Sequence, residues 1–285
     1  MPFELVALSP AVFFSLSSIM TRKGLDGSTP HTGSLIVLVV QLVFFSASLA
    51  VVDFSRISLS VYWIAFVAAG LSSPALSLLF LYRSIQRIGV APTSSISNTH
   101  AIFGALWAFM FLGERPPAMV WLGILLVVAG VFWMTSGGGP LARGRALFLP
   151  FASAAFFGLA HMLRKLGLGG MDSLVFGGFL QSVSACIVGP VFLKASTGWS
   201  PFVFNRTSLV NFIWAGLAMG AAQLTLMAAL SMGDVSRVSP LVATVPLFTL
   251  ALAPLILGRR ERITSRIVFG ALFIVAGVIL VTSLR

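Results

Sequence analysis

The sequence predicts an all-α polytopic membrane protein with ten transmembrane helices, arranged as two inverted five-helix repeats. Its composition, the spacing of its apolar stretches and an internal repeat lead to this fold class. Of the 285 residues, 58% are hydrophobic and only 9% are charged, whereas soluble domains are about 45–50% apolar and about 25% charged. The composition therefore excludes a water-soluble enzyme, and the high hydrophobicity excludes a disordered chain.

Ten mainly apolar stretches are each close to the roughly 20 residues that a helix needs to cross a bilayer. They lie between charges and Pro, Gly or Ser clusters, at 3–20, 34–52, 61–82, 91–112, 118–136, 146–163, 173–193, 208–230, 235–257 and 266–284. They nearly exhaust the chain, so no soluble domain is expected. A membrane β-barrel would instead show alternating apolar and polar residues.

The charges and the single cysteine exclude several other classes. Cys186 alone cannot form a disulfide framework or a Cys-based metal site, and no cofactor is predicted. The net charge of +11 is better explained by Lys and Arg beside anionic lipid than by nucleic-acid binding, because no basic stripe interleaved with aromatic residues occurs. The N-terminus has no basic region before its first apolar stretch, which is not typical of a cleaved signal peptide.

The chain repeats itself. GERPPAMVWLGILLVVAGVFWM from Gly113 matches GRRERITSRIVFGALFIVAGVILV from Gly258, and IGVAPTSSISNTHAIF matches MGDVSRVSPLVATVPLF. We therefore expect a first repeat at 1–136, a linker at 137–145 and a second repeat at 146–285. Since five helices per half is an odd number, the second repeat must be inserted upside down, as in many secondary transporters.

These motifs resemble the drug/metabolite transporter superfamily, EamA type. GER followed by LG and AG, with the degenerate copy GRRER, FG and VAG, carries the resemblance over essentially the whole chain. It implies ten helices around a central cavity, and export or exchange of small metabolites across the cytoplasmic (inner) membrane of a prokaryote. In the second copy Arg259 stands where Glu114 stands in the first, so the Gly-Glu pair is lost unless Glu261 replaces it.

The orientation of the chain stays open at this point. Both termini should share one side, because ten is even. Lys and Arg are twice as frequent in loops opposite the termini as on the terminal side, which includes Arg164 and Lys165, and this favours termini outside. The resemblance implies cytoplasmic termini.

Polar residues within the stretches are the candidate substrate ligands, because polar groups in hydrocarbon are costly and usually face the bundle interior. The proposed set is Asn98, His100, Gln41, Gln181, Gln223, Trp107, Ser18 and Ser73. Asn98, His100 and Trp107 belong to the most polar stretch. Prolines at Pro92, Pro240, Pro246 and Pro254 predict matching broken helices there and in the ninth stretch. Hydrogen bonding between helices is the alternative for these side chains. His161 and the Glu114–Arg115 pair are interpreted as an interfacial residue and a structural ion pair or cap.

The sequence thus predicts a secondary transporter that moves a small organic solute by alternating access of a central cavity. Uncharged candidate ligands, His100 apart, favour zwitterions, amides or aromatic compounds over phosphates. All seven acids fall at helix ends or in loops, which argues against coupling through a membrane carboxylate; proton linkage through His100, exchange and facilitated efflux all stay open. The alternatives are a membrane-embedded lipid-modifying enzyme, which would need a nucleophile with a base or a metal cluster, and a non-transporting membrane partner protein.

Overall fold

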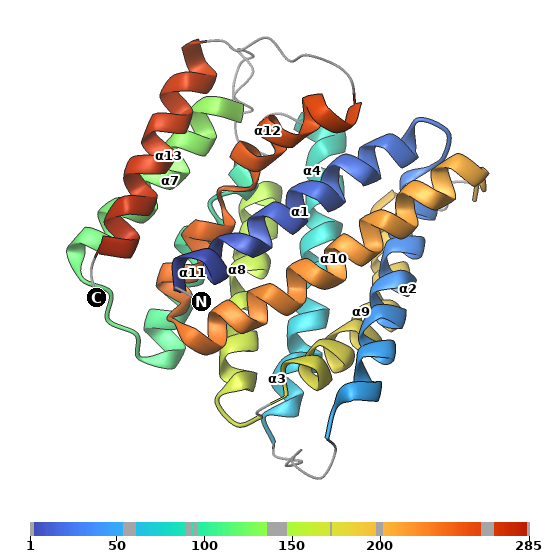
Figure 1. Ribbon diagram of the computed structural model, residues 1–285, viewed down its shortest axis with the longest axis horizontal. Helices are drawn as coiled ribbons and strands as arrows, with labels where there is room; N and C mark the ends of the chain where they lie inside the picture. Colours follow the sequence, from blue (N-terminus) through green and yellow to red (C-terminus); the bar gives the residue numbers. More distant parts are fainter. Residues whose placement is uncertain are drawn as a thin grey trace.

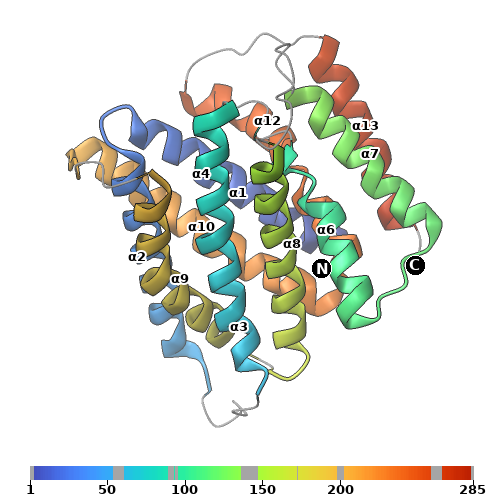
Figure 2. The same ribbon diagram turned by 180° about the vertical axis from the view of Figure 1, so that it is seen from behind.

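The fold is all helical over the residues that the structure describes. The computed structural model (Figures 1 and 2) describes residues 3–53, 61–88, 93, 96–135, 147–171, 173–197, 202–257 and 265–283, and these contain no β-strand. The predicted linker at 137–145 and Pro92 lie outside the described residues.

The helices follow the predicted stretches closely. The first half contains α1 (Phe3–Leu25), α2 (Pro30–Ser48), η1 (Leu49–Val51), α3 (Trp63–Gly70), η3 (Leu71–Leu76), α4 (Ser77–Ile88), α6 (His100–Trp107), η4 (Ala108–Leu112) and α7 (Ala118–Thr135). The second half contains α8 (Phe148–Leu168), α9 (Leu174–Thr197), α10 (Arg206–Met232), α11 (Val235–Val242), α12 (Val245–Leu257) and α13 (Ser265–Ser283).

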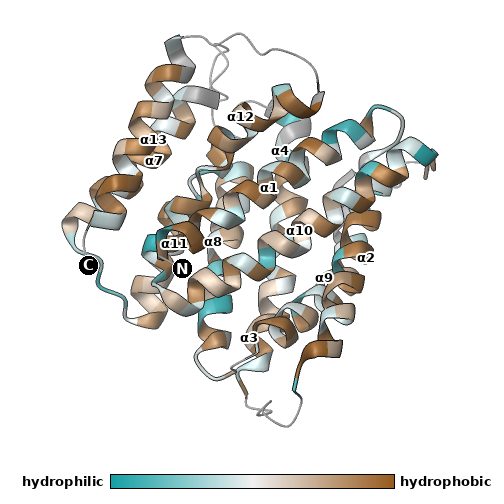
Figure 3. Cartoon of the chain, viewed as in Figure 1, coloured by the Kyte–Doolittle hydropathy of each residue, from teal (hydrophilic) through white to brown (hydrophobic). Residues whose placement is uncertain are grey.

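Length and composition make this a membrane protein. Six helical segments are long and apolar enough to cross a bilayer: Phe3–Leu25, His31–Val51, Trp63–Leu81, Leu174–Val191, Arg206–Met232 and Val235–Ile256. Shorter apolar helices cover His100–Leu112, Ala118–Trp133 and Val268–Ser283. The 21-residue α8 is not among either set, and it carries His161, Arg164 and Lys165. Figure 3 shows hydrophilic residues on α8 within an otherwise largely hydrophobic bundle.

Helices from the two halves are interleaved. α1 packs along α10, while α8 packs along α3, η3 and α4; α2 contacts both α9 and α10. α6 packs on α8 and α11, and α1 packs on α11 and α12. α8 therefore lies in the middle of the molecule, against helices of both halves (Figure 2).

Small residues let α7 and α13 approach each other closely at one edge of the bundle (Figure 1). A Cβ atom on Gly123 would lie 2.8 Å from the Gly277 carbonyl oxygen, and one on Gly130 would lie 2.6 Å from the Gly270 oxygen. The earlier glycine of α7 faces the later glycine of α13, so the two helices run antiparallel. Small residues permit such close contact between helices in a membrane.

Among the described residues, three of the apolar stretches contain an interrupted helix. In the third stretch Ser73 leaves the helical conformation (φ −148°, ψ 125°) just before Pro74. The other two interruptions are turns at Asn98–Thr99, ahead of α6, and at Ala243–Thr244, between α11 and α12. Thr99 Oγ1 donates to the Ile96 carbonyl at 2.7 Å, and Thr244 Oγ1 donates to the Leu241 carbonyl at 2.6 Å. The predicted break in the ninth stretch is confirmed, and the described part of the fourth stretch carries a similar turn.

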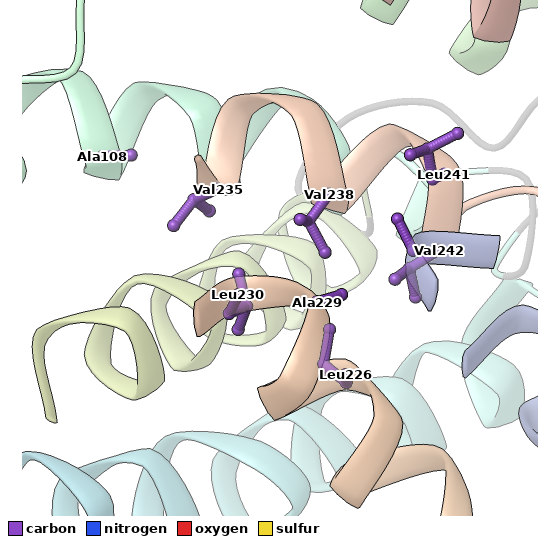
Figure 4. Close-up of a cluster of buried hydrophobic side chains, with 9 residues drawn as sticks. Ala108, Leu226, Ala229, Leu230, Val235, Val238, Leu241 and Val242 are labelled. Carbon is purple, nitrogen blue, oxygen red and sulfur yellow. The ribbon is translucent and has the colours of Figure 1, made fainter. Parts of the chain in front are cut away.

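An apolar cluster packs around α11. Its members come from α1, η4, α10 and α11: Ala7, Ala108, Leu226, Ala229, Leu230, Val235, Val238, Leu241 and Val242 (Figure 4). Because these residues belong to both halves, the cluster joins the halves.

Glu114 adds a polar contact between the halves. Its carboxylate accepts hydrogen bonds from the backbone nitrogens of Val235 at 2.8 Å and Ser236 at 3.1 Å. It therefore caps the first turn of α11, where backbone N–H groups have no helical partner and a negative charge is favourable. The interpretation of Glu114 as a cap is confirmed, with a helix of the other half as its partner.

Candidate functional site

A group of buried polar side chains surrounds the second half of α8. We call it the α8 polar cluster, and it consists of His100 from α6, His161 and Arg164 from α8, Gln181 from α9 and Ser239 from α11. All five side chains are buried, and the most exposed of them is His100 at 8%. Buried polar groups in a membrane protein are costly, and for that reason they commonly mark sites of function.

The two histidines join three helices. His161 Nδ1 lies 2.9 Å from Ser239 Oγ, and the His161 and His100 rings are 5.8 Å apart between centroids. His100 Nδ1 lies 3.2 Å from the Ser97 carbonyl oxygen. A carbonyl can only accept, so Nδ1 of His100 carries the hydrogen, and Nε2 of the neutral ring is an acceptor.

Arg164 and Gln181 form the other part of the cluster. Arg164 is 1% exposed and Gln181 is fully buried, and Arg164 Nε donates to Gln181 Oε1 at 2.7 Å. Arg164 follows His161 by three residues, so the two side chains share a face of α8. This pair anchors the guanidinium by only one of its three nitrogens.

Several polar atoms of the cluster have no hydrogen-bond partner although they are buried. They are Nε2 of His100, Nε2 of His161, both terminal nitrogens of Arg164 and Nε2 of Gln181. Nearly all buried polar groups in native proteins are hydrogen-bonded, and each exception requires an explanation. The cluster therefore has unused hydrogen-bonding capacity for a ligand, mostly as donors.

Some predicted residues lie in or beside the cluster. His100 and Gln181 belong to it. Asn98 lies in the turn before α6 and is partly buried. Trp107 is partly buried on the same helix as His100, and its Nε1 donates to the Ala155 carbonyl of α8 at 3.0 Å.

Gln223 is buried on α10, and its Oε1 has no partner. It lies one helical turn before Met227, which shares an apolar cluster with Leu168 of α8.

The remaining predicted residues lie elsewhere. Gln41 is buried on α2, which packs against α9 and α10. Ser73 is buried at the interruption of the third stretch and accepts a hydrogen bond from Ser77 Oγ at 3.1 Å.

Ser18 is exposed, which corrects its expected place in the interior of the bundle. The neighbouring Ser17 is the buried serine, and its Oγ donates to the Ala215 carbonyl of α10 at 2.9 Å. Because α1 packs along α10, the rotation of the helix turns Ser17, not Ser18, into this contact.

Two further expectations were wrong, and both concern α8. His161 was expected at the membrane interface, and Arg164 was counted with the loop charges, but both are buried. The reason is that α8 continues to Leu168, beyond the apolar stretch that ended at residue 163. The signal was in the sequence: Phe157, His161, Arg164 and Leu168 recur at helical spacing.

Lys165 explains how the end of α8 is anchored. Its Nζ donates to the carbonyl oxygens of Leu230 at 2.7 Å and Gly233 at 2.9 Å. It thereby satisfies carbonyls at the C-terminus of α10, where a cation is favourable.

Comparison with known proteins identifies the family. The model of the EamA-like transporter family matches twice, over residues 1–136 and 144–283. The chain belongs to the EamA-like transporter family. The resemblance inferred from the GER, LG and AG motifs is thus confirmed, and membership of a transporter family favours transport over catalysis.

Two individual proteins are similar to this chain. A protein of Sinorhizobium sp. called "Uncharacterized transporter in cobO 3'region" is 26% identical over 127 residues, which are 44% of this chain and 89% of that protein. A crystal structure superimposes with a TM-score of 0.81 over 99% of this chain and 96% of its own, at 14% identity. The latter likeness concerns the fold alone.

Proposed function

We propose that this EamA-like protein is a secondary transporter that moves a small organic solute by alternating access, with its binding site at the α8 polar cluster. The observation that carries the proposal is the composition of this cluster. Its polar side chains come from α6 of the first half and from α8, α9 and α11 of the second, and they lie between the halves of a transporter-family chain. Sites in such proteins lie near the midplane, at the interface between repeats.

The proposal includes ten membrane crossings in two inverted five-helix repeats, at 1–136 and 146–285. If the two halves correspond, α1 is equivalent to α8, α2 to α9, and α3–α4 to α10. The contact of α1 with α10 should then have an equivalent in a contact of α8 with α3 and α4. Both contacts exist. The antiparallel pairing of α7 with α13 and the similar turns at Thr99 and Thr244 also support this arrangement.

The Sinorhizobium relative gives independent support for a five-helix unit. The same 127 matched residues make up 44% of this chain but 89% of that protein. A related protein of about half this length fits the proposal that one half of this chain corresponds to one repeat.

Two broken helices point toward the same site. The turns at Asn98–Thr99 and Ala243–Thr244 interrupt the helices that carry His100 and Ser239. Interrupted helices at corresponding positions free backbone groups at membrane depth, and in transporters they commonly contribute to the substrate site. We assign Asn98, His100, Trp107, Gln181 and Gln223 to this site.

Gln41, Ser18 and Ser73 have weaker claims as ligands, since their positions lie outside the cluster. We retain Gln41 as a testable alternative, because it and Gln181 occupy matching places in the two halves. Export from a prokaryotic cell across its inner membrane completes the proposal, supported by the bacterial source of the half-length relative.

Transport into liposomes tests the proposal. The purified protein is reconstituted and exposed to a pool of amino acids, nucleosides and aromatic metabolites under imposed pH and Na⁺ gradients, and the lumen is analysed by mass spectrometry. We expect saturable accumulation of one chemical class relative to empty liposomes. Gln181→Leu should reduce this uptake strongly, because it removes a side chain of the cluster, while Gln41→Leu serves as the matched control.

The outcomes separate the alternatives. If both variants reduce uptake equally, the site uses the two amides as a symmetric pair and is not centred on α8. If folded, inserted protein accumulates no solute under any gradient, transport itself is rejected in favour of a membrane partner function.

A further inference from the structure

Arg164 is a buried cation without a counter-ion among the described residues. It is 1% exposed, its terminal nitrogens have no hydrogen-bond partner, and its Nε is bound to an uncharged amide. The buried polar side chains of the described ranges include no Asp or Glu. The only other titratable side chains of the α8 polar cluster are His100 and His161, and neither supplies a negative charge.

Such an arrangement is expensive unless something pairs with it. Leaving a charge buried without a partner is strongly destabilising, and arginines inside membranes mostly pair or line a pathway. Packing alone would favour Leu or Met at this position of α8. The retained charge therefore points to an anionic ligand.

The free donors match a carboxylate. With Nε held by Gln181, the two terminal nitrogens of the guanidinium stay available side by side, and this pair can donate to both oxygens of one carboxylate. Nε2 of Gln181 adds a further free donor beside Arg164. Gln223 Oε1 of α10 and His100 Nε2 of α6 are buried acceptors without partners, so the remainder of the ligand can carry a donor group.

We propose that the Arg164 guanidinium, positioned by Gln181, binds the carboxylate of the transported solute. The inference rests on the proposed transport function and narrows its substrate class to organic acids and amino acids. Of the solutes that the sequence favours, zwitterions such as amino acids fit this site, whereas simple amides do not. Both terminal nitrogens are shielded from solvent in this conformation, so the solute reaches them when the halves part. A ligand that pairs with the charge then stabilises the conformation that holds it.

Binding is measured first, without transport. The thermal unfolding of the purified protein in detergent is followed with matched pairs of an acid and its primary amide: formate and formamide, benzoate and benzamide, phenylalanine and phenylalaninamide. At least one acid should raise the midpoint, and its amide should not. Arg164→Gln should weaken the apparent affinity by about tenfold or more, since a charge-assisted bidentate pair is lost. Arg164→Lys should retain part of it, and the exposed Arg115→Gln is the matched control.

Several results would overturn the inference: an amide that stabilises as well as its acid, an Arg164→Gln variant that binds acids normally, or no acid that shifts the wild type. Equal stabilisation by chloride or sulfate would make this an unselective anion site. If Arg164→Gln fails to fold, Arg164→Lys decides by comparison of the same acid–amide pairs. The stabilising acid is finally tested in proteoliposomes. Arg164-dependent binding without uptake would reject the transport function and leave the carboxylate site standing.

Discussion

Glu114 shows how a single side chain connects the halves of this protein. Its carboxylate accepts two backbone hydrogen bonds at the start of α11, across more than a hundred residues of sequence. We predict that Glu114→Gln lowers the free energy of unfolding by about 1–2 kcal/mol, because capping bonds and the favourable charge at the helix N-terminus are both weakened. The measurement is the thermal midpoint of the purified protein in detergent.

The neighbouring Arg115 provides the control for this prediction, since it is exposed and close in sequence. Arg115→Gln should leave the midpoint nearly unchanged. Equal losses for the two variants would show that the loop as a whole, and not the cap, stabilises this end of the bundle.

Individual site residues were predictable where their local sequence was polar and helical. His100 could be predicted because its apolar stretch contains more polar residues than any other. Arg164 was missed because a cation four residues from the end of α8 usually belongs to a loop, and its burial depends on contacts with α9 that a single stretch cannot show. Ser18 and Ser17 differ only in helix rotation, which packing against α10 determines.

At the scale of helices, the α7–α13 pair depends on close contact between backbones. A Cβ on Gly130 would approach the Gly270 oxygen to 2.6 Å and the Ile274 backbone nitrogen to 2.9 Å. We predict that Gly130→Val destabilises the protein by about 2 kcal/mol, because backbone atoms cannot move aside as a flexible side chain would. The midpoint of thermal unfolding and the yield of monodisperse protein both report this loss.

Leu125→Ala on the exposed side of the same helix is the comparison, since Leu125 is 54% exposed. It should change the midpoint little. If it matched Gly130→Val, the helix itself and not its contact with α13 would be the sensitive feature.

Helices were more predictable than their interruptions. Apolar stretches bounded by charges fix where a helix can lie in a membrane, and the observed ends differ from the expected ones by only a few residues for α7, α9 and α13. The turn between α11 and α12 was signalled by Pro240 and Pro246, whereas its backbone pattern, with Thr244 Oγ1 bonded to Leu241, required the structure.

At the scale of the whole molecule, the two halves are joined by several long helix–helix contacts, unlike two separate domains. α1 packs along α10, α6 along α8 and α7 along α13, so each half is incomplete without the other. We predict that residues 1–140 and 141–285, produced together as two chains, assemble into a complex that purifies through a tag on either fragment and retains transport. The covalent linker then serves only to keep the halves together.

The same split chain shows which contact holds the assembly. Carried on the first fragment, Gly130→Val should reduce the recovery of the second fragment, because it separates α7 from α13, while Leu125→Ala should not. A first fragment that purifies alone as a folded, helical species would contradict the prediction. It would mean that the first half of the chain folds by itself, and that α1 and α10 pack together only after each half has folded. The half-length Sinorhizobium relative makes this outcome worth testing.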